Sequence, residues 1–250
     1  MKASPPLLSI ITVCLNEPQL ERTCESIVNQ TFQDFEWIVI DGGSNDETLA
    51  IFERYKNRMD YFVSEPDGGI FFGMNKGIGQ AAGEWLNFMN AGDCFAQDNV
   101  LEIVSKFIIS NAKHAGIVYG HHVVCDDENS RVVTSQEYVD KKSVFTRGPH
   151  HQSSFIRKSL FDLTGNYNTE YTVLADKDFY LKLFAKNQCK LCKVDIPIAI
   201  YSQEGLSSTN KHLVFKELSR IRSNYFSSEE ILELKREQAL QVRSLMQSKA

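Results

Sequence analysis

Asp93 is the acidic residue whose position in the sequence first indicates chemistry. It follows an apolar run over residues 85–89 that is typical of a buried strand, and Gly92 beside it lets backbone approach closely. In open α/β sheets, ligands bind at the carboxyl ends of the strands, so a carboxylate at this point can bind a ligand. A turn or a helix cap is the other common role for such an aspartate, and this stretch alone leaves both interpretations open.

Further polar side chains are expected at the same edge of the sheet. The apolar, β-branched runs over residues 7–13 and 35–40 are typical of buried strands. Asn16 and Glu17 follow the first run, and Asp41 follows the second. Helical spacing between the runs favours a parallel sheet, and right-handed crossovers place the strand ends at one edge. We therefore expect these side chains to share a rim with the carboxylate described above.

The rest of the chain continues to alternate strands and helices, with Asn75 and Lys76 on one helix and Asp176 and Asp178 at the amino end of another. Strands are expected over residues 61–63, 116–119, 131–134, 153–156, 191–194 and 198–201, with His121 and His122 just after the second of these. Helices are expected over residues 19–30, 46–56 (capped by Ser44 or Asn45), 70–82, 98–111, 158–163 and 176–185. From residue 211 onward the pattern is helical and charged, with a break near residues 224–228.

Composition argues against several classes of protein. The net charge of −5 argues against nucleic acid as the main partner, and no apolar stretch approaches the roughly 18–20 residues of a membrane span. The first residues lack the pattern of a secretory leader, so we expect a cytoplasmic protein whose 6 cysteines are mostly free thiols. Cys189 and Cys192 have the spacing of half a zinc site, but no second ligand pair accompanies them.

Several short segments, in one order along the chain, resemble the family 2 glycosyltransferases of the GT-A fold. Each segment alone is weakly specific, but their order over about residues 7–205 is a strong signal. The first six are Ser9-Ile10-Ile11-Thr12-Val13 with Asn16, Gln30-Thr31-Phe32, Phe35-Glu36-Trp37-Ile38-Val39-Ile40-Asp41-Gly42-Gly43-Ser44-Asn45-Asp46, Ser64-Glu65-Pro66-Asp67-Gly68-Gly69-Ile70, Met74-Asn75-Lys76-Gly77 and Asn90-Ala91-Gly92-Asp93. The last two are His151-Gln152-Ser153 and Ala175-Asp176-Lys177-Asp178-Phe179.

The resemblance implies a fold and a reaction. The expected fold is α/β, a GT-A-type Rossmann-like sandwich with a mostly parallel central sheet, followed by a helical C-terminal extension. The glycosyltransferase domain would comprise residues 1–209, with a nucleotide-sugar half over 7–115 and an acceptor half over 116–209, and the extension would comprise 210–250. The implied reaction moves a sugar, with inversion, from a nucleotide-diphosphate donor to a hydroxyl of a glycan or lipid-linked acceptor. A UDP-sugar is the favoured donor, and surface polysaccharide biosynthesis is the expected pathway.

The resemblance also implies roles for individual residues. The base and ribose would be held by Thr12, Cys14, Asn16, Glu17, Asp41 and Gly43, and the nucleotide and diphosphate would lie along Asp67, Asn75 and Lys76. Asn90 and Ala91 would contact the ribose, and Asp93 would bind Mg²⁺ or Mn²⁺. Asp176 would be the catalytic base, and the candidate acceptor contacts are His151, Gln152 and Asp178.

Elementary chemistry supports these roles independently. The diphosphate leaving group gains negative charge as the glycosidic bond breaks, and a divalent cation can neutralise that charge as a Lewis acid. Lys76 can add a point charge. Inversion needs a carboxylate opposite the leaving group to take the proton of the acceptor hydroxyl. Asp176 and Asp178 both stand at the start of a helix, and Asp176 is preferred because it matches the family's position.

Three departures from the family's pattern lie within the expected site. Ala91 replaces the first carboxylate of a common Asp-x-Asp, Ala175 replaces a glutamate before the base, and Phe72 stands where relatives often carry aspartate. The expected metal site is therefore poor in carboxylates, and donor phosphates and water would supply the other ligands. Two alternatives stay open: a catalytically inactive nucleotide-sugar binding module, and a nucleotidyltransferase on a related fold.

The amphipathic tail after residue 211 carries lysine, arginine and glutamate on its polar face. We expect it to pack against the domain, with a homodimer contact or a membrane surface as the alternatives. The expected location is the cytoplasm, with peripheral contact at the inner face of the membrane as the alternative.

Overall fold

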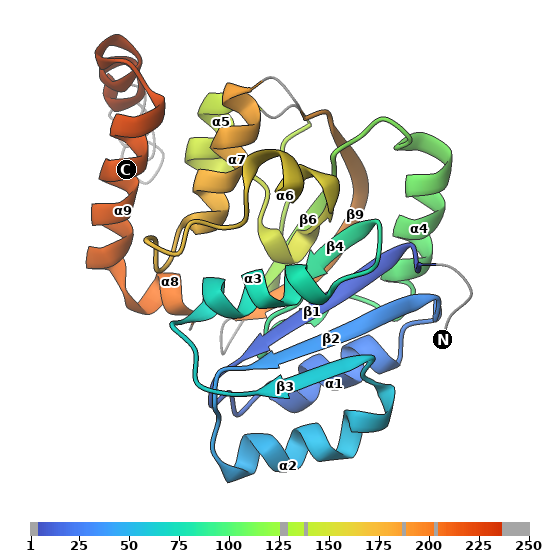
Figure 1. Ribbon diagram of the computed structural model, residues 1–250. Coiled ribbons are helices and arrows are strands. Elements are labelled where there is room, and N and C mark those ends of the chain that lie inside the picture. The colour runs from blue at the N-terminus through green and yellow to red at the C-terminus, as the bar shows by residue number, and fades with distance from the viewer. Residues whose placement is uncertain (1–4, 126–129, 138–139, 187–188, 203–204, 237–250) are drawn as a thin grey trace.

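The chain folds around one curled central sheet (Figure 1). The computed structural model describes residues 5–125, 130–137, 140–186, 189–202 and 205–236. The strand order is β3-β2-β1-β4-β8-β6-β9-β5, and β7 pairs with β6. The strands are β1 (Leu8–Cys14), β2 (Phe35–Asp41), β3 (Tyr61–Ser64), β4 (Trp85–Phe88), β5 (Cys94–Phe95), β6 (Ile117–Cys125), β7 (Ser130–Val133), β8 (Ser154–Arg157) and β9 (Leu191–Ser202).

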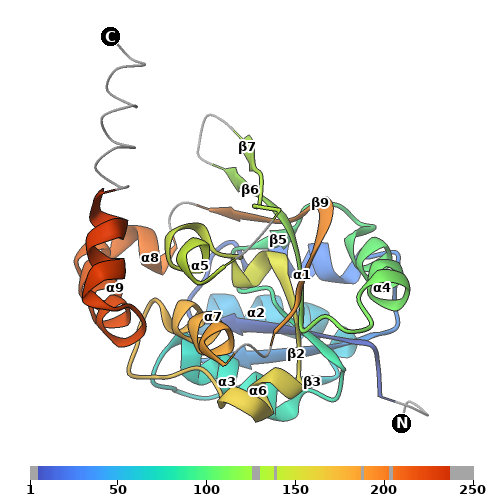
Figure 2. The same cartoon turned by 90° about the horizontal axis from the view of Figure 1, so that it is seen from above.

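Helices cover both faces of the sheet (Figure 2). Apolar side chains of α1 (Leu20–Val28), α2 (Asp46–Tyr55) and α4 (Val100–Asn111) pack against one face. Those of α3 (Ile70–Gln80), α5 (Lys141–Arg147), α6 (Ser159–Thr164), α7 (Ala175–Ala185) and α9 (Lys211–Tyr225) pack against the other. The 3₁₀ turns η1 (Lys56–Arg58) and η2 (His151–Ser153) and the short helix α8 (Leu206–Thr209) complete the elements.

Strands β3, β2, β1 and β4 are parallel neighbours, as the alternating pattern predicts. Every residue of β1 is buried because the strand lies between the two helical layers. Gly77 lets α3 approach β1, since a Cβ there would lie 2.5 Å from Cγ2 of Ile11. Most paired residues of the whole sheet lie in parallel ladders, and β8 joins the two parts by antiparallel pairing with β4 and β6.

The later strands differ from the predicted ones. Strand β6 continues through His121 and His122, which were expected to follow it. The two strands predicted over residues 191–194 and 198–201 form one strand, β9, that runs through Pro197. The β6–β9 ladder shifts register between Tyr119 and His122, next to that proline. A proline cannot donate a ladder hydrogen bond, so the irregularity lets the strand continue past it.

Local signals were also missed or misread. Helix α5 and strand β5 were not predicted. Asn45 is the N-cap residue of α2, but its side chain makes no capping hydrogen bond. The hydroxyl of Ser44 binds Asp41 instead.

The C-terminal helices pack on the rest of the chain. Ile221 of α9, Phe226 and Leu234 belong to the same hydrophobic cluster as side chains of α3 and α7. The break at residues 226–227 separates α9 from a further helical stretch over residues 228–236 and agrees with the prediction. In the described part of the chain, no helix is long and apolar enough to span a membrane.

Candidate active site

The carboxylate of Asp41, at the end of β2, is fully buried and hydrogen-bonded. Its Oδ2 accepts from Ser44 N at 2.9 Å, Gly43 N at 3.2 Å and Ser64 Oγ at 2.6 Å. These bonds satisfy a charge that burial would otherwise penalise. Asp41 therefore stabilises the loop after β2, and its expected contact with a nucleotide base stays a prediction.

Asn16 ties the loop after β1 to the loop after β2. Its N–H donates to Ser44 Oγ at 2.8 Å, and its Oδ1 accepts from Asn45 N at 2.8 Å. The φ of Asn16 is +50°, a left-handed conformation that asparagine tolerates better than most residues. Gly43 has a φ of +90°, and a Cβ there would lie 3.1 Å from Pro66 N, so this turn requires glycine.

Two of the expected nucleotide contacts lie inside the protein. Thr12 is fully buried, and its hydroxyl accepts a hydrogen bond of 3.0 Å from Nε1 of Trp37. Cys14 is also buried, and burial raises the pKa of its thiol to about 12. Both side chains therefore lie beneath the rim and pack its loops from below.

Asp67 and the α3 residues Asn75 and Lys76 come close to the same rim in different ways. The carboxylate of Asp67 accepts from Gly69 N at 2.8 Å and lies beside Gly73, whose added Cβ would meet it at 3.2 Å. Asn75 uses both amide atoms on the backbone of Tyr167, at 2.9 and 3.0 Å. Lys76 Nζ pairs with the exposed Glu65 at 2.6 Å. Of these two α3 side chains, Asn75 is bound to the backbone of the protein, whereas Lys76 pairs with a solvent-exposed side chain.

The turn after β4 is fixed by Thr23 of α1. Gly92 N donates to Thr23 Oγ1 at 2.9 Å, and Thr23 Oγ1 donates to the carbonyl oxygen of Asp93 at 2.6 Å. Gly92 has a φ of +90°, and an added Cβ would lie 3.1 Å from Cδ of Glu17. The carboxylate of Glu17 therefore lies beside the turn that leads into Asp93.

Asp93 carries the carboxylate expected to bind a metal. Gln152 Nε2 donates to its Oδ2 at 3.1 Å. Burial raises its pKa to about 6, against the Gln152 hydrogen bond and the charges of His151 and Arg22. Oδ1 of Asn90 and Oε1 of Gln152 are buried without a hydrogen-bond partner among the described residues. These oxygens suit a hard divalent cation. The described residues include no cluster of three or more His, Cys, Asp or Glu side chains placed so that they could hold a metal ion.

His151 connects the end of β4 with the start of α7. Its Nδ1 lies 3.0 Å from Oδ2 of Asp176, and its Nε2 lies 3.0 Å from Nδ2 of Asn90. A carboxylate only accepts, so Nδ1 donates to Asp176, and Nε2 accepts from the Asn90 amide when the ring is neutral. Burial opposes ionisation of Asp176, but the His151 hydrogen bond and the nearby charges of His151 and Lys177 hold its pKa below the ordinary value.

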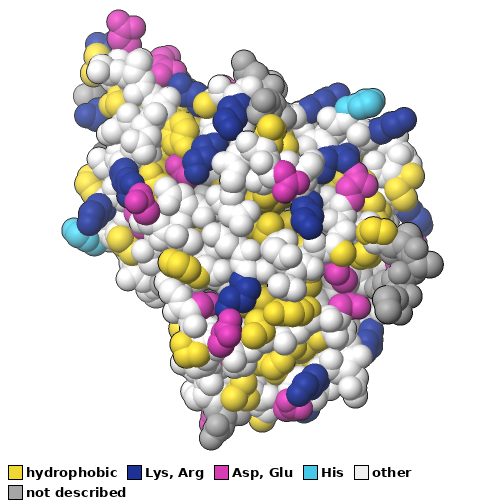
Figure 3. Space-filling view, in the orientation of Figure 1, with side chains coloured by type: hydrophobic (Ala, Val, Ile, Leu, Met, Phe, Trp, Pro, Cys, Tyr) yellow, Lys and Arg dark blue, Asp and Glu magenta, His cyan; other side chains and the backbone are white. Residues whose placement is uncertain are grey.

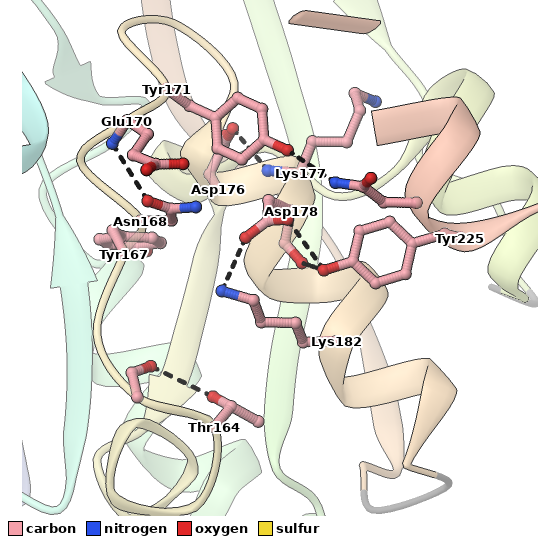
Figure 4. A network of polar contacts seen from close by, with 12 residues as sticks. Thr164, Tyr167, Asn168, Glu170, Tyr171, Asp176, Lys177, Asp178, Lys182 and Tyr225 are labelled. Atoms are coloured by element: carbon pink, nitrogen blue, oxygen red, sulfur yellow. Dashed lines mark hydrogen bonds and ion pairs between the residues drawn. The ribbon is translucent and has the colours of Figure 1, made fainter. Parts of the chain in front are cut away.

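The neighbouring residues of α7 point elsewhere (Figure 4). Asp178 accepts from the Tyr225 hydroxyl at 2.8 Å and pairs with Lys182 Nζ at 2.7 Å. Lys177 Nζ donates to the carbonyl oxygens of Val144 and Phe145 at 2.9 and 3.0 Å. Asp176 and Asp178 thus have separate surroundings, which the sequence did not reveal.

Three rings lie beside this cluster. The His122 ring is 4.4 Å from that of His150 and 5.2 Å from that of Tyr201. Burial lowers the pKa of His122 to about 4, and the charges of His121 and Arg131 add to this. Burial and then the charge of Asp93 raise the pKa of Tyr201.

The structure brings together five of the residues predicted for the site: Asn90, Asp93, His151, Gln152 and Asp176. It directs Thr12, Asn75 and Asp178 toward internal partners. Thr23 binds the turn after β4 and Glu217 binds the turn before α7, and neither residue was predicted for the site. Glu217 did carry a signal, because it is the single acidic residue of the basic helix α9. Acidic and basic side chains are interspersed over the face in Figure 3, and neither sign dominates it.

Comparison with known proteins identifies the family. The family described as "Glycosyl transferase family 2" matches residues 9–184. The chain belongs to this family. It is 34% identical over 209 residues to a PGL/p-HBAD biosynthesis glycosyltransferase of Mycobacterium bovis, which covers 82% of this chain and 80% of the relative. It is 30% identical over 141 residues to an uncharacterized glycosyltransferase of Haemophilus influenzae, over 54% of this chain and 55% of that protein.

Solved structures agree with this fold. The crystal structure of S. aureus TarS 1–349 has a TM-score of 0.67 at 22% identity, over 89% of this chain and 67% of that one. The mannosyltransferase PcManGT from Pyrobaculum calidifontis, in complex with GDP-Man and Mn²⁺, has a TM-score of 0.58 at 15% identity, over 79% of this chain and 57% of that one. At these identities the likeness shows the GT-A fold.

Proposed function

We propose that this glycosyltransferase inverts the anomeric carbon as it moves a sugar from a nucleotide-diphosphate donor to an acceptor hydroxyl. The observation that carries the proposal is the series of hydrogen bonds from Asn90 through His151 to Asp176, beside the bond from Gln152 to Asp93. These bonds join the end of β4 to the start of α7. One carboxylate would then serve the donor and another the acceptor in the same site.

Asp176 is the base in this proposal. Its lowered pKa keeps the carboxylate ionised at neutral pH, ready to take the proton of the acceptor hydroxyl as that oxygen attacks the anomeric carbon. The bond from the anomeric carbon to the diphosphate oxygen breaks, and the electron pair stays on the diphosphate. His151 holds Asp176 in orientation through Nδ1, and Asn90 holds His151 through Nε2.

The donor would lie along the rim formed by Asn16, Glu17, Asp67 and Lys76. Lys76 would give up its exposed pair with Glu65 for the more highly charged diphosphate. Asp93 would hold Mg²⁺ or Mn²⁺ together with the amide oxygens of Asn90 and Gln152, which have no hydrogen-bond partner among the described residues. When bound, the cation stabilises the leaving diphosphate as a Lewis acid.

A UDP-sugar is the favoured donor, because two TarS structures of this fold are complexes with UDP and UDP-GlcNAc. A glycan or lipid-linked acceptor is the favoured class, because the similar M. bovis protein is described as acting in PGL/p-HBAD biosynthesis. We place the reaction in surface glycoconjugate synthesis at the cytoplasmic side of the membrane. One observation favours a second candidate, a nucleotide-sugar binding module without activity: the described residues assemble no trio of metal-binding side chains.

A thermal-shift screen followed by a transfer assay tests the proposal. UDP, GDP and their sugars are added to the protein with and without Mn²⁺ or Mg²⁺. A UDP-sugar with metal should give the largest rise in melting temperature, since a ligand at 100 times its Kd adds about 2.7 kcal/mol of stability. Adding glycan or lipid-linked acceptors should then release UDP. Binding without transfer or donor hydrolysis would favour the inactive module, and pyrophosphate release from a nucleoside triphosphate would indicate a nucleotidyltransferase.

A further inference from the structure

Glu217, in the middle of α9, has an unusual set of partners. Its side chain is buried, with a relative exposure of 6%. Its carboxylate accepts hydrogen bonds from three successive backbone N–H groups, those of Thr172 at 2.7 Å, Val173 at 3.1 Å and Leu174 at 2.9 Å. Among the described residues it forms no ion pair. A buried carboxylate is costly unless it is fully hydrogen-bonded, so these amides account for its burial.

The three amides lie immediately before α7. Leu174 is the N-cap residue of that helix and has no side chain that can cap it. Glu217 therefore accepts, from another helix, the N–H of the N-cap residue and those of the two residues before it; in a capping box, a glutamate within the helix itself accepts the N-cap N–H. Its negative charge also lies at the amino end of α7, where the helix dipole favours an anion. Asp176 is the second residue of α7, so the bonded turn leads directly into it.

Helix α9 contacts the same segment on both sides of Asp176. Before it, Asn224 Nδ2 donates to the Tyr171 hydroxyl at 3.3 Å, and the Arg220 guanidinium lies 4.9 Å from the centre of the Tyr171 ring. After it, Tyr225 donates to Asp178 at 2.8 Å. Figure 4 shows Tyr171, Asp176, Asp178 and Tyr225 along this contact. The start of α7 is thus held between α9 and the His151 ring.

We propose that Glu217 is a positioning residue for Asp176, and that α9 is for this reason part of the catalytic unit. The inference rests on the proposed function, in which Asp176 is the base. Glu217 fixes the turn over residues 172–174, and this sets the direction in which α7 begins. The Asp176 carboxylate then lies at hydrogen-bond distance from His151 and faces the acceptor hydroxyl. Misplacement of a catalytic group by about 1 Å can cost on the order of 100-fold in rate.

The test compares Glu217→Gln and Glu217→Ala with the wild-type full-length chain. Glutamine keeps the shape and one acceptor oxygen, whereas alanine removes both. Glu170→Gln is the matched control. It breaks the exposed pair that Glu170 forms with Arg220 of α9 but leaves the backbone N–H groups of residues 172–174 bonded to Glu217. All variants are assayed well below their melting temperatures for kcat, for the KM of the donor and for donor affinity by thermal shift.

We expect kcat to fall about tenfold in Glu217→Gln and further in Glu217→Ala, with donor affinity and KM within twofold of wild type. Glu170→Gln should keep wild-type kcat. A purely structural role would leave kcat per folded molecule unchanged, so wild-type kcat in a folded Glu217→Gln would overturn the inference. If both Glu217 variants fail to fold, hydrogen exchange of the wild type decides: amides 172–174 must be protected as strongly as those within α7.

A parallel assay of Asp176→Asn separates this inference from the proposed function. If Asp176→Asn loses transfer and Glu217→Gln does not, the positioning role fails while the proposed function stands. If Asp176→Asn keeps transfer, the assignment of the base fails first.

Discussion

The two halves of the molecule hold their polar side chains in different ways. In residues 7–115, the rim loops bind one another: Asn16 to the loop after β2, Asp41 to Ser44 and Ser64, and Gly92 to Thr23. From residue 116 onward, Asp176 depends on segments far away in sequence. His151 binds its side chain, and Glu217 binds the turn before it. A repeating strand-helix unit brings its own loops together, whereas the second half needs several separate segments at once.

The largest expected effect concerns the two aspartates of α7. Their different hydrogen-bond partners, His151 for Asp176 and Tyr225 for Asp178, give them different expected roles. Asp176→Asn should lower the rate of transfer by roughly 10²–10⁴-fold, the usual contribution of a general base, with donor affinity almost unchanged. Asp178→Asn should mainly lower stability, because Asp178 binds Tyr225 and Lys182. Single-turnover transfer and thermal melts measure the two effects. Wild-type turnover by Asp176→Asn would contradict the assignment of Asp176 as the catalytic base.

Strands β1, β2, β3 and β4 could be predicted from the sequence because each is a short apolar run, and the helices between them have clear apolar faces. The two-residue strand β5 is too short to leave such a pattern. The parallel sheet and the shared rim then follow from the right-handed crossovers, whereas the strand order β3-β2-β1-β4 was not predicted. What the pattern does not reveal is the direction of each polar side chain. Thr12 and Asn75 both belong to the expected site, yet internal partners on Trp37 and Tyr167 take their polar atoms.

The second half was harder to predict because its order depends on long-range contacts. The two parts of β9 were predicted as separate strands, because the sequence alone does not show the register shift against β6 that lets β9 continue through Pro197. Helix α5 has 7 residues, too few for its periodicity to stand out, and begins at a capping box on Asp140. The role of Glu217 needs both α9 and the turn before α7, 43 to 45 residues away. Periodicity within one window cannot reveal such a pairing.

A buried histidine of the second half, His122, makes the stability of the protein depend on pH. In the second half, His122 is buried, and its Nδ1 has no hydrogen-bond partner in the described part of the chain. Its pKa is lowered to about 4 from 6.5 in the unfolded chain, so between these values the unfolded state binds a proton that the folded state does not. The contribution of His122 to stability is therefore complete above pH 6.5 and is lost as the pH drops toward 4, by about 3 kcal/mol in total.

His122→Phe should flatten this pH dependence, because phenylalanine fills the same space and does not titrate. Urea unfolding at pH 7 and pH 4.5 measures the change in the free energy of unfolding. His114→Gln, at an exposed histidine of the first half, is the matched control and should keep the wild-type slope. An equal loss of stability in His122→Phe and the wild type would mean that other groups carry the acid sensitivity.

The smallest expected effects concern Asn75 and Lys76, adjacent residues of α3 whose side chains have different kinds of partner. Asn75 belongs to the first half but binds the Tyr167 backbone of the second with both amide atoms. Asn75→Ala should therefore cost about 1–3 kcal/mol of stability, because it leaves two partly buried backbone groups unpaired.

Lys76→Ala breaks only a surface pair with Glu65, worth about 0–1 kcal/mol, but should weaken donor binding about tenfold through loss of a charge-assisted contact with the diphosphate. Denaturant unfolding and donor titration of both variants separate the two roles. If Asn75→Ala instead loses donor affinity at wild-type stability, the first half reaches its ligand through Asn75 as the family resemblance implied, and the contact with Tyr167 gives way when donor binds.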